Sequence, residues 1–485
     1  MERILIDKTP QKKGETVKVC GWVWNRRDHG KLIFIDLKDR SGVLQCVFTP
    51  GNAELHKLGD TLRTGFVVEL TGQIAERPRG MINADLSTGE IELQAEELKI
   101  LNESLTPPFA LDTDGLEIGE DVRMKYRYLD LRRDRLQKNI RARHKMIQFI
   151  RTWLTEKDFT EIETPILTKS TPEGARDYVV PARRERGKFY ALPQSPQQYK
   201  QLLMVAGFER YFQIARCFRD EDTRGDRQPE FTQLDLEMSF VDREDVMELN
   251  EKLLIDLVKK TAPRKKIQET PFPRLTYREA MDKYGTDRPD LRKDKNDHST
   301  LAFCWVVDFP FFEKTKGISS SDSGRSDSES LQTRTRSSTW TFTHNPFSRP
   351  REEYMDWLMN KEKIGEILTT QYDVVLNGFE IGGGSIRNHQ PEPLKKVFEI
   401  MGFTEDRIVN NFGHMLTALS YGAPPHGGIA WGLDRLVAIL TGEPNIREVF
   451  SFPKTGDGRD LMMDAPSEIG PEQLKELGLS IKNNV

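Results

Sequence analysis

The clearest chemical signal in the sequence is one run of charged and aromatic residues, RCFRDEDTRGDRQPEFTQLDLEMSF at 216–240. The run predicts two short strands joined by a charged loop that contains glycine. Such a hairpin suits a nucleoside triphosphate, because the planar guanidinium of Arg219 can pair with a phosphate and Phe231 can stack beneath a purine ring. A charged surface hairpin would explain any four of these residues, but the run as a whole favours a nucleotide site.

Two further segments carry residues that suit the same ligand. GGIAWGLDRL at 427–436 contributes a second arginine, Arg435, and FEIGGGSIR at 379–387 lies between the two arginine segments. The sequence has no GxxxxGK[ST] motif, and its glycine run is not a GxGxxG, so neither a P-loop nor a dinucleotide-binding fold is expected. The arginine segments instead resemble motifs 2 and 3 of class II aminoacyl-tRNA synthetases, and the residues around them resemble those of the aspartyl enzymes.

This resemblance extends from Gly21 to about Pro466 and implies a reaction in two steps. Aspartate attacks the α-phosphate of ATP, which yields aspartyl-adenylate and pyrophosphate. The terminal ribose hydroxyl of the tRNA then attacks the acyl carbon. Neither step needs a side-chain nucleophile, so the enzyme has to solve a problem of positioning and of charge stabilisation.

By this resemblance, Arg219 would hold the α-phosphate and Arg435 the γ-phosphate of a bent ATP, which makes both of them catalytic residues. The ATP-binding residues that the resemblance implies are Arg219, Asp220, Glu221, Gln228, Phe231, Glu380, Gly432, Leu433, Asp434 and Arg435. Asp373 and Glu380 are hard oxygen ligands suited to Mg²⁺, which would bridge the phosphates. Without the resemblance, Asp373 would be interpreted as a turn residue at the end of a strand.

The amino acid substrate presents one ammonium and two carboxylates. Arg387 could clamp its side-chain carboxylate bidentately, and Lys200 would add a second positive charge. The aspartate-binding residues that the resemblance implies are Glu173, Ser195, Gln197, Gln198, Tyr199, Lys200, Arg219, Asp235, His344 and Arg387. A lone histidine is usually structural, and only its motif, HNPF, singles out His344.

The N-terminal part, residues 17–101, alternates apolar and polar residues in five segments that are separated by turn residues. Five strands fit a small barrel of the oligonucleotide-binding type, although a generic β-sandwich is an alternative. The hairpin RRDHGKLIFIDLKDRSG resembles the anticodon-binding barrel of aspartyl, asparaginyl and lysyl enzymes. The anticodon-binding residues implied are Arg27, His29, Phe34, Gln45 and Glu92. From its strand alone, Phe34 would be interpreted as a core residue; the resemblance makes it a platform for a base.

Two residues bear on the choice of tRNA. His29 resembles the version found in bacterial enzymes that charge both tRNA(Asp) and tRNA(Asn), whereas enzymes restricted to tRNA(Asp) tend to carry leucine there. Gly80 lies near a second position associated with the same difference. A strictly discriminating enzyme remains the alternative.

The fold class expected is α+β, with the barrel followed by an antiparallel sheet flanked by helices. The expected domains are an anticodon-binding barrel at 1–105, a hinge at 106–135 and a catalytic domain at 136–485. A long helix is predicted at 136–157, followed by EIETP, which resembles motif 1. Motif 1 forms the dimer interface in this class, so we expect a homodimer.

Composition supports a globular protein, with 37% hydrophobic and 31% charged residues among 485. The net charge of −4 gives no global nucleic-acid signal, so tRNA would have to contact local basic patches such as Arg26-Arg27 or Arg132-Arg133. The four cysteines form no CxxC pair, which favours free thiols in a reducing compartment. The sequence has no apolar run long enough to span a membrane, and its first residues lack the apolar core of a signal peptide, so a cytoplasmic location without membrane contact is expected.

The sequence departs from the bacterial aspartyl pattern in two places. The domain that such enzymes insert between segments like TDRPDLR and WVVDFP is missing, because only twelve residues, KDKNDHSTLAFC, join Arg292 to Trp305. A serine-rich stretch at 318–339 predicts a disordered surface loop, with a phosphorylated or regulatory loop as the alternative.

Two other functions fit parts of the sequence. An asparaginyl or lysyl ligase shares the barrel and the catalytic motifs, but TPEGARDY, QPEFTQLD and FEIGGGSIR favour aspartate. A catalytically inactive relative that binds tRNA is the other alternative. The presence of Arg219, Glu221, Glu380, Arg387 and Arg435 argues against it.

Overall fold

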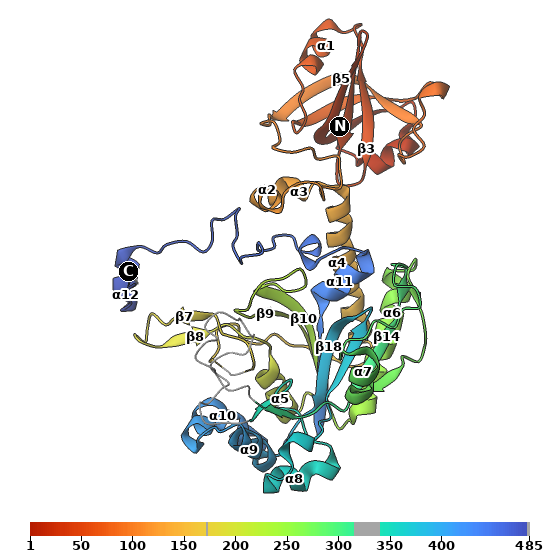
Figure 1. Cartoon of the computed structure of the whole chain (residues 1–485). Coiled ribbons are helices and arrows are strands. Elements are labelled where there is room, and N and C mark those ends of the chain that lie inside the picture. Colours follow the sequence, from red (N-terminus) through yellow and green to blue (C-terminus); the bar gives the residue numbers. More distant parts are fainter. Residues whose placement is uncertain (171–172, 315–339, 483–485) are drawn as a thin grey trace. The chain divides into compact units, whose positions relative to one another are not determined.

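The computed structural model describes residues 1–170, 173–314 and 340–482, so the serine-rich stretch at 318–339, predicted to be disordered, lies entirely outside the described residues. The chain divides into two compact units, Met1–Arg135 and Leu136–Val485 (Figure 1). No helix in the described part of the chain is both long and apolar enough to span a membrane. All four cysteines are free thiols.

The first unit contains a closed five-stranded barrel, as predicted. Its strands are hydrogen-bonded in the order β1-β2-β3-β5-β4, and only β3 and β5 run parallel to each other. The strands are β1 (Thr16–His29), β2 (Leu32–Lys38), β3 (Val43–Phe48), β4 (Val67–Glu76) and β5 (Ile91–Asn102), with α1 (Ala53–Asp60) between β3 and β4. Alternation along β2 sends Ile33 and Ile35 into the barrel core and leaves Phe34 on the outer face, partly exposed. The core interpretation of Phe34 is therefore wrong.

Residues 120–133 of this unit surround one buried carboxylate. Asp130 lies at the end of α3 (Arg127–Asp130), which follows α2 (Glu120–Lys125). It accepts hydrogen bonds from Arg123 at 3.0 Å, Arg127 at 2.7 Å and Arg133 at 2.7 Å. Charge-assisted bonds of this kind hold residues 120–133 in one arrangement.

The second unit is an eight-stranded, mostly antiparallel sheet in the order β12-β14-β17-β18-β19-β10-β9-β6. Its strands are β6 (Thr160–Glu161), β9 (Arg210–Phe218), β10 (Glu230–Ser239), β12 (Arg274–Thr276), β14 (Phe303–Val307), β17 (Tyr372–Leu376), β18 (Phe379–Ile386) and β19 (His426–Gly432). Short two-stranded sheets pair β7 (Val179–Pro181) with β8 (Phe189–Ala191), β11 (Lys266–Ile267) with β13 (Thr300–Leu301), and β15 (Phe312–Lys314) with β16 (Trp340–Phe342). The architecture confirms the predicted α+β fold.

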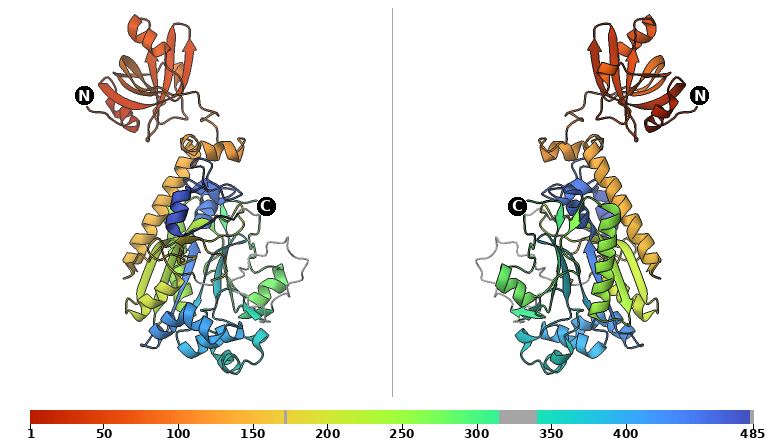
Figure 2. Two further views of the ribbon diagram at one scale, coloured as in Figure 1. Left: turned by 90° about the vertical axis from the view of Figure 1, so that its left-hand side faces the viewer. Right: turned by 90° about the vertical axis from the view of Figure 1, so that its right-hand side faces the viewer.

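The helices of this unit are α4 (Asp134–Thr155), α5 (Gln197–Val205), α6 (Arg243–Thr261), α7 (Tyr277–Tyr284), α8 (Met355–Asn360), α9 (Pro391–Ile400), α10 (Glu405–Leu419), α11 (Leu433–Thr441) and α12 (Pro471–Leu477). Helix α4 begins and ends within two residues of the predicted bounds. Apolar side chains of α4, α6 and α11 form one core with alternate residues of the central strands. Figure 2 shows α4 and α6 on the same side of the sheet.

Strand β10 explains how the sheet separates its core from its polar face. Leu234, Leu236 and Met238 pack into the core with the helices. Because side chains alternate along a strand, Asp235 and Glu237 point to the opposite face, where they are buried but polar. The buried polar side chains of β10 therefore lie on the face of the sheet away from α4 and α6.

Candidate active site

A cavity of about 410 Å³ lies on the polar face of the sheet. It is lined by the loop between β9 and β10, by β18 and β19, and by the start of α11. Eight of the ten residues predicted to bind ATP line it: Arg219, Glu221, Gln228, Phe231, Glu380, Gly432, Asp434 and Arg435. The other two do not, because Asp220 lines a neighbouring groove and Leu433 is buried among the core residues.

Arg219 and Phe231 lie together on the wall of this cavity. Arg219 directly follows β9, and its backbone N–H donates to the Pro229 carbonyl at 2.8 Å, which closes the hairpin. Its guanidinium lies 5.1 Å from the centroid of the Phe231 ring. No carboxylate of the described residues forms an ion pair with it, so its charge is available to an anionic ligand.

Arg435 is held from two sides. Its Nη2 lies 3.2 Å from the Asp226 carboxylate in the loop between β9 and β10, and its Nη1 donates to the carbonyl of Glu380. Its Nε is buried and has no hydrogen-bond partner among the described residues. The two predicted phosphate-binding arginines thus share one cavity but differ in their neighbours.

Asp434 lines the cavity, yet its carboxylate is used by the protein itself. One oxygen accepts from the Thr232 backbone N–H at 2.8 Å, and the other is ion-paired with Arg143 of α4. Burial raises the pKa of Asp434, against the opposing effect of Arg143. The contacts of Asp434 join α4, β10 and α11 next to Arg435.

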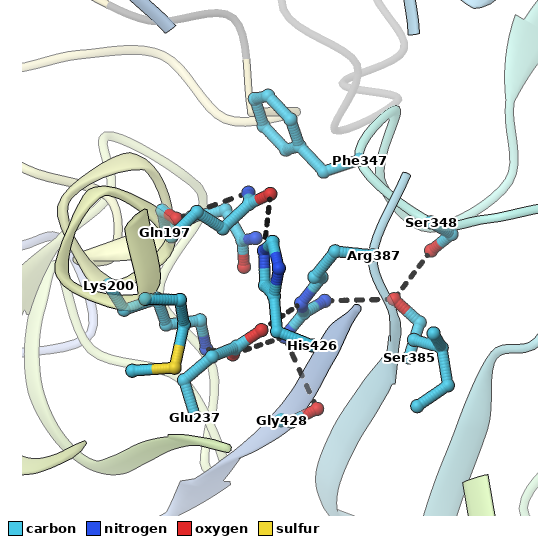
Figure 3. A network of polar contacts seen from close by, with 12 residues as sticks. Gln197, Lys200, Glu237, Phe347, Ser348, Ser385, Arg387, His426 and Gly428 are labelled. Carbon is cyan, nitrogen blue, oxygen red and sulfur yellow. Dashed lines mark hydrogen bonds and ion pairs between the residues drawn. The ribbon is translucent and has the colours of Figure 1, made fainter. Parts of the chain in front are cut away.

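The two cations predicted to bind the substrate side chain do not line the cavity; both are buried beside Glu237 (Figure 3). Lys200 donates to Asp235 at 2.6 Å and lies 3.2 Å from Glu237. Arg387 donates to the two Glu237 oxygens at 2.8 and 3.1 Å. Burial opposes the ionisation of Glu237, but the charges of Arg387 and Lys200 outweigh it and lower its pKa.

Sequence reasoning missed Glu237, although a signal was available. The residue lies two positions after Asp235 in an alternating strand, so the two side chains must share a face. Burial raises the pKa of Asp235, whereas the pKa of Glu237 is lowered. The two carboxylates of one strand therefore lie in different electrostatic environments.

The remaining residues predicted to bind aspartate form hydrogen bonds with other side chains of the protein. Glu173 accepts from the Ser195 hydroxyl at 2.8 Å and lines the cavity. The Gln198 amide oxygen lies 2.7 Å from a ring nitrogen of His414, and the Tyr199 hydroxyl lies 3.0 Å from that of Thr168. Within the described part of the chain, three buried atoms of these predicted residues have no hydrogen-bond partner: Gln197 Nε2, Gln198 Nε2 and Asp235 Oδ2. Such atoms suit a polar ligand, because a buried polar group without a partner is costly.

Asp373 and Glu380, the predicted Mg²⁺ ligands, interact electrostatically. Burial and the nearby charge of Glu380 raise the pKa of Asp373 well above its usual range. One Asp373 oxygen accepts from Gln371 at 2.8 Å, and the other lies 3.9 Å from His344, which also lines the cavity. Burial lowers the pKa of His344. A carboxylate whose ionisation is opposed by a neighbouring carboxylate fits a divalent cation, although the described residues contain no group of three potential ligands.

Four of the five predicted anticodon residues, all except His29, converge on the outer face of the barrel. Arg27 lies opposite Phe34 in the β1–β2 ladder and donates to Asp36 at 2.7 Å and to Gln45 at 3.4 Å. Gln45 in turn donates to Glu92 at 2.9 Å. These contacts bring Arg27, Phe34, Gln45 and Glu92 into one surface.

Two further residues of the barrel were predicted to affect tRNA choice. His29 ends β1 and is exposed, and Gly80 lies in the exposed turn at Arg79–Met81. No contact joins either residue to the cluster around Gln45 in the described structure. Their part in tRNA choice therefore rests on the sequence.

Sequence reasoning missed one residue near this surface, Arg77. Its Nε donates to the Ile91 carbonyl at 2.8 Å, while its Nη2 is buried without a partner among the described residues. Burial lowers the pKa of Arg77, and the charges of Glu92 and Asp36 oppose that effect. An arginine directly after strand β4 was a weak signal, because only the fold places it beside Glu92.

Comparison with known proteins agrees with this arrangement. Residues 119–456 match the family of class II tRNA synthetases (D, K and N), and residues 17–101 match the OB-fold nucleic acid binding domain. The chain is 42% identical to an aspartate–tRNA(Asp/Asn) ligase of Desulfatibacillum aliphaticivorans, over 97% of this chain and 96% of that protein. It is 41% identical to an aspartate–tRNA ligase of Staphylococcus saprophyticus, over 97% of each chain.

The lengths of these alignments also bear on the missing domain. The first spans 596 positions, more than the 485 residues of this chain, so the relative carries residues that have no counterpart here. Among solved structures, the asparaginyl-tRNA synthetase of Pyrococcus horikoshii has a TM-score of 0.73 at 21% identity and covers 94% of this chain and 98% of that one. That likeness concerns the fold alone. By its family match and its full-length relatives, the chain belongs to the class II aminoacyl-tRNA synthetases, among the aspartate–tRNA ligases.

Proposed function

We propose that this aspartate–tRNA ligase binds ATP in the cavity between Arg219 and Arg435, binds aspartate against Lys200 and Arg387, and charges both tRNA(Asp) and tRNA(Asn). The observation that supports the ATP site most strongly is that Arg219, Phe231 and Arg435 line the same cavity. These side chains come from segments about 200 residues apart in the sequence. A base platform and two phosphate-binding cations are the groups that a bent triphosphate needs.

In the first step, the α-carboxylate of aspartate attacks the α-phosphate of ATP and pyrophosphate leaves. Arg219 stabilises the negative charge that grows on the α-phosphate oxygens, because no carboxylate among the described residues neutralises its guanidinium. Arg435 holds the outer phosphate and so orients the leaving group. Phe231 stacks on the adenine, which fixes the nucleotide with its α-phosphate near Arg219.

Magnesium would be held by Asp373 and Glu380. The raised pKa of Asp373 supports this role, since a divalent cation would offset the effect of the Glu380 charge on it. Because the described residues contain no group of three potential ligands, groups other than protein side chains would have to complete its coordination. When bound, it would neutralise part of the charge of the triphosphate.

The ammonium and α-carboxylate of aspartate would meet the atoms that lack partners. Asp235 Oδ2 can accept a hydrogen bond from the ammonium, and Gln197 Nε2 can donate one to a carboxylate. Glu173 lines the cavity close by and adds negative charge for the ammonium. The side-chain carboxylate would face Arg387 and Lys200, the only buried cations in this network (within the described residues).

In the second step, a hydroxyl of the terminal tRNA ribose attacks the acyl carbon of the adenylate. Selection of the tRNA would take place at the barrel, where Phe34 provides a stacking surface and Arg27, Gln45 and Glu92 provide donors and acceptors for base edges. Relatives at similar identity are named either as aspartate–tRNA(Asp/Asn) ligases or as aspartate–tRNA ligases. His29 is the reason to place this chain with the first group.

Two further properties belong to the proposal. Ile166 and Leu167, which directly follow motif 1, are exposed at 48% and 53%, as expected for residues that a second subunit covers. We therefore propose a homodimer. Residues 106–135 would act as the hinge between the anticodon-binding barrel and the catalytic domain, and the tRNA and ATP substrates imply a cytoplasmic location.

Aspartate-dependent exchange of pyrophosphate into ATP tests the first step. Wild-type enzyme should exchange with aspartate and not with asparagine or lysine. The variant Arg387→Leu should raise the KM for aspartate strongly and leave ATP binding nearly unchanged, because Arg387 is proposed to contact aspartate and does not line the ATP cavity. An unchanged KM for aspartate in that variant would contradict the proposed aspartate site.

A further inference from the structure

The guanidinium of Arg387 has almost no free donors. Of its five N–H groups, Nε and Nη2 donate to the two Glu237 oxygens at 2.8 and 3.1 Å. Nη2 also donates to the Gly428 carbonyl at 3.2 Å, and Nη1 donates to the Ser385 hydroxyl at 2.8 Å (Figure 3). Four donors are therefore used, and one N–H of Nη1 remains. Arg387 cannot clamp a substrate carboxylate with its full fork while these contacts hold.

Lys200 is in a similar position. Its ammonium has three N–H groups. One donates to Asp235 at 2.6 Å, and a Glu237 oxygen lies 3.2 Å away as a second partner. A single N–H of Lys200 is then left for a ligand.

Glu237 is the residue common to both cations, and the sheet is built to hold it. Its side chain is fully buried. It lies opposite Gly428 in the β10–β19 ladder, and a Cβ at position 428 would come within 2.2 Å of the Glu237 carboxylate. The absence of a side chain at Gly428 makes the space for Glu237, while the Gly428 carbonyl holds Arg387. Two neighbouring strands thus fix one carboxylate between two cations.

We propose that Glu237 is a positioning residue that sets the specificity of this enzyme for aspartate. By occupying one edge of Arg387 and one donor of Lys200, it leaves one N–H from each cation to hold the side-chain carboxylate of the substrate. The substrate is then held by two different residues at one point each, in place of a bidentate arginine clamp. This inference rests on the proposed function, which places that carboxylate against Arg387 and Lys200.

The variants Glu237→Gln and Glu237→Asp separate charge from position. Glutamine keeps the length but turns an amide N–H₂ towards the donors of Arg387 or Lys200; aspartate keeps the charge but is too short to reach both cations. We expect each variant to raise the KM and the Kd for aspartate about 10–100-fold, by analogy with the loss seen when a residue that orients a metal ligand is removed. The KM for ATP should stay within about twofold, because Arg219 and Arg435 are untouched.

Glu230→Gln is the matched control. Glu230 lies on the same strand but is ion-paired with Arg216 and Lys454 beside the neighbouring groove. The KM of the Glu230→Gln enzyme for aspartate should therefore equal that of wild type. Thermal unfolding reports whether each variant is folded, and Glu237→Asp decides the matter if Glu237→Gln does not fold. A wild-type KM for aspartate in folded Glu237→Asp would overturn the proposal, as would an equal rise in the KM for ATP.

Arg387→Leu separates this proposal from the proposed function. If Arg387→Leu raises the KM for aspartate and the Glu237 variants do not, only the role of Glu237 is wrong. If Arg387→Leu itself has no effect, the aspartate site has been misplaced and the role of Glu237 is rejected with it.

Discussion

The Arg435 guanidinium lies 3.2 Å from the Asp226 carboxylate, so the arginine proposed for the outer phosphate of ATP is already paired with an acid. Asp226 belongs to the loop between β9 and β10, whereas Arg435 belongs to α11. Arg219 has no such carboxylate partner among the described residues. A carboxylate and a phosphate compete for the same guanidinium donors, so ATP has to displace Asp226 from Arg435.

Asp226→Asn should therefore strengthen ATP binding. Both side chains are partly exposed, at 34% and 21%, so the ion pair is weak and the Kd for ATP should fall only about 2–5-fold. Titration with a non-hydrolysable ATP analogue measures this change. Asp222→Asn in the same loop is the control and should bind like wild type. Weaker or unchanged ATP binding by Asp226→Asn would contradict the competition.

Arg219→Ala and Arg435→Ala should each nearly abolish the formation of aspartyl-adenylate. Each variant removes a preorganised positive charge at a phosphate, a loss that typically costs ~10²–10³ in rate. Pyrophosphate exchange at saturating ATP and aspartate checks this, with thermal unfolding to show that the fold persists. Exchange near the wild-type rate in either variant would show that the phosphates lie elsewhere.

Arg143→Met should destabilise the second unit by leaving Asp434 buried without its cation. Removal of one partner of a buried pair typically costs 3–5 kcal/mol; because the Arg143 side chain is 16% exposed, we expect about 3 kcal/mol. Lys145→Met, at an exposed position of the same helix, should change stability by less than about 0.5 kcal/mol. The thermal midpoint of the second unit measures both, and equal midpoints for the two variants would contradict the structural role of Asp434.

Stability should also fall at mildly acidic pH because of His426. Burial lowers its pKa, and Arg387 and His389 act in the same direction, whereas Glu237 and a hydrogen bond to Pro424 oppose them. The folded protein keeps the ring neutral while the unfolded chain takes up a proton near pH ~6.5, so this contribution is present above that pH and is lost as the pH falls. His426→Gln should therefore show a smaller drop in thermal midpoint between about pH 7.5 and 5.5 than wild type. Identical slopes would assign the pH dependence to other groups.

The sequence predicts a site residue when that residue belongs to a recognisable motif. It does not predict a residue whose role depends on a partner far away in the sequence. Arg219, Phe231 and Arg435 were identified from local motifs, and the fold brings them to one cavity. Glu237 was missed because its importance comes from Arg387, 150 positions away in the sequence, and from the register that sets it opposite Gly428.

Two other cases show the same limit. Asp434 was assigned to the nucleotide from its motif, but only the packing of α4 shows that Arg143 uses its carboxylate. Alternation of side chains along β2 does predict that Phe34 faces away from Ile33 and Ile35, yet not which face of the barrel is the core. The strand pattern was therefore sufficient to predict the five-stranded barrel, but not to predict whether the Phe34 ring is buried in its core.

His29→Leu should lower the charging of tRNA(Asn) more than that of tRNA(Asp). The third anticodon base is C in tRNA(Asp) and U in tRNA(Asn). At the same position on the ring, C has an amino group that donates a hydrogen bond and U has a carbonyl that accepts one. A neutral imidazole can donate from one nitrogen and accept at the other, whereas leucine can do neither. Initial rates of aspartylation with each tRNA measure the ratio. A proportional loss with both tRNAs would show that His29 does not discriminate between them.

The measurement that tests the central claim most directly is aspartylation by the wild-type enzyme of purified tRNA(Asp) and tRNA(Asn), each assayed separately with ATP, Mg²⁺ and labelled aspartate. We predict that both tRNAs are aspartylated. Aspartylation of tRNA(Asp) alone would contradict the proposed dual specificity, and failure to aspartylate either tRNA would contradict the assignment of the site as a whole.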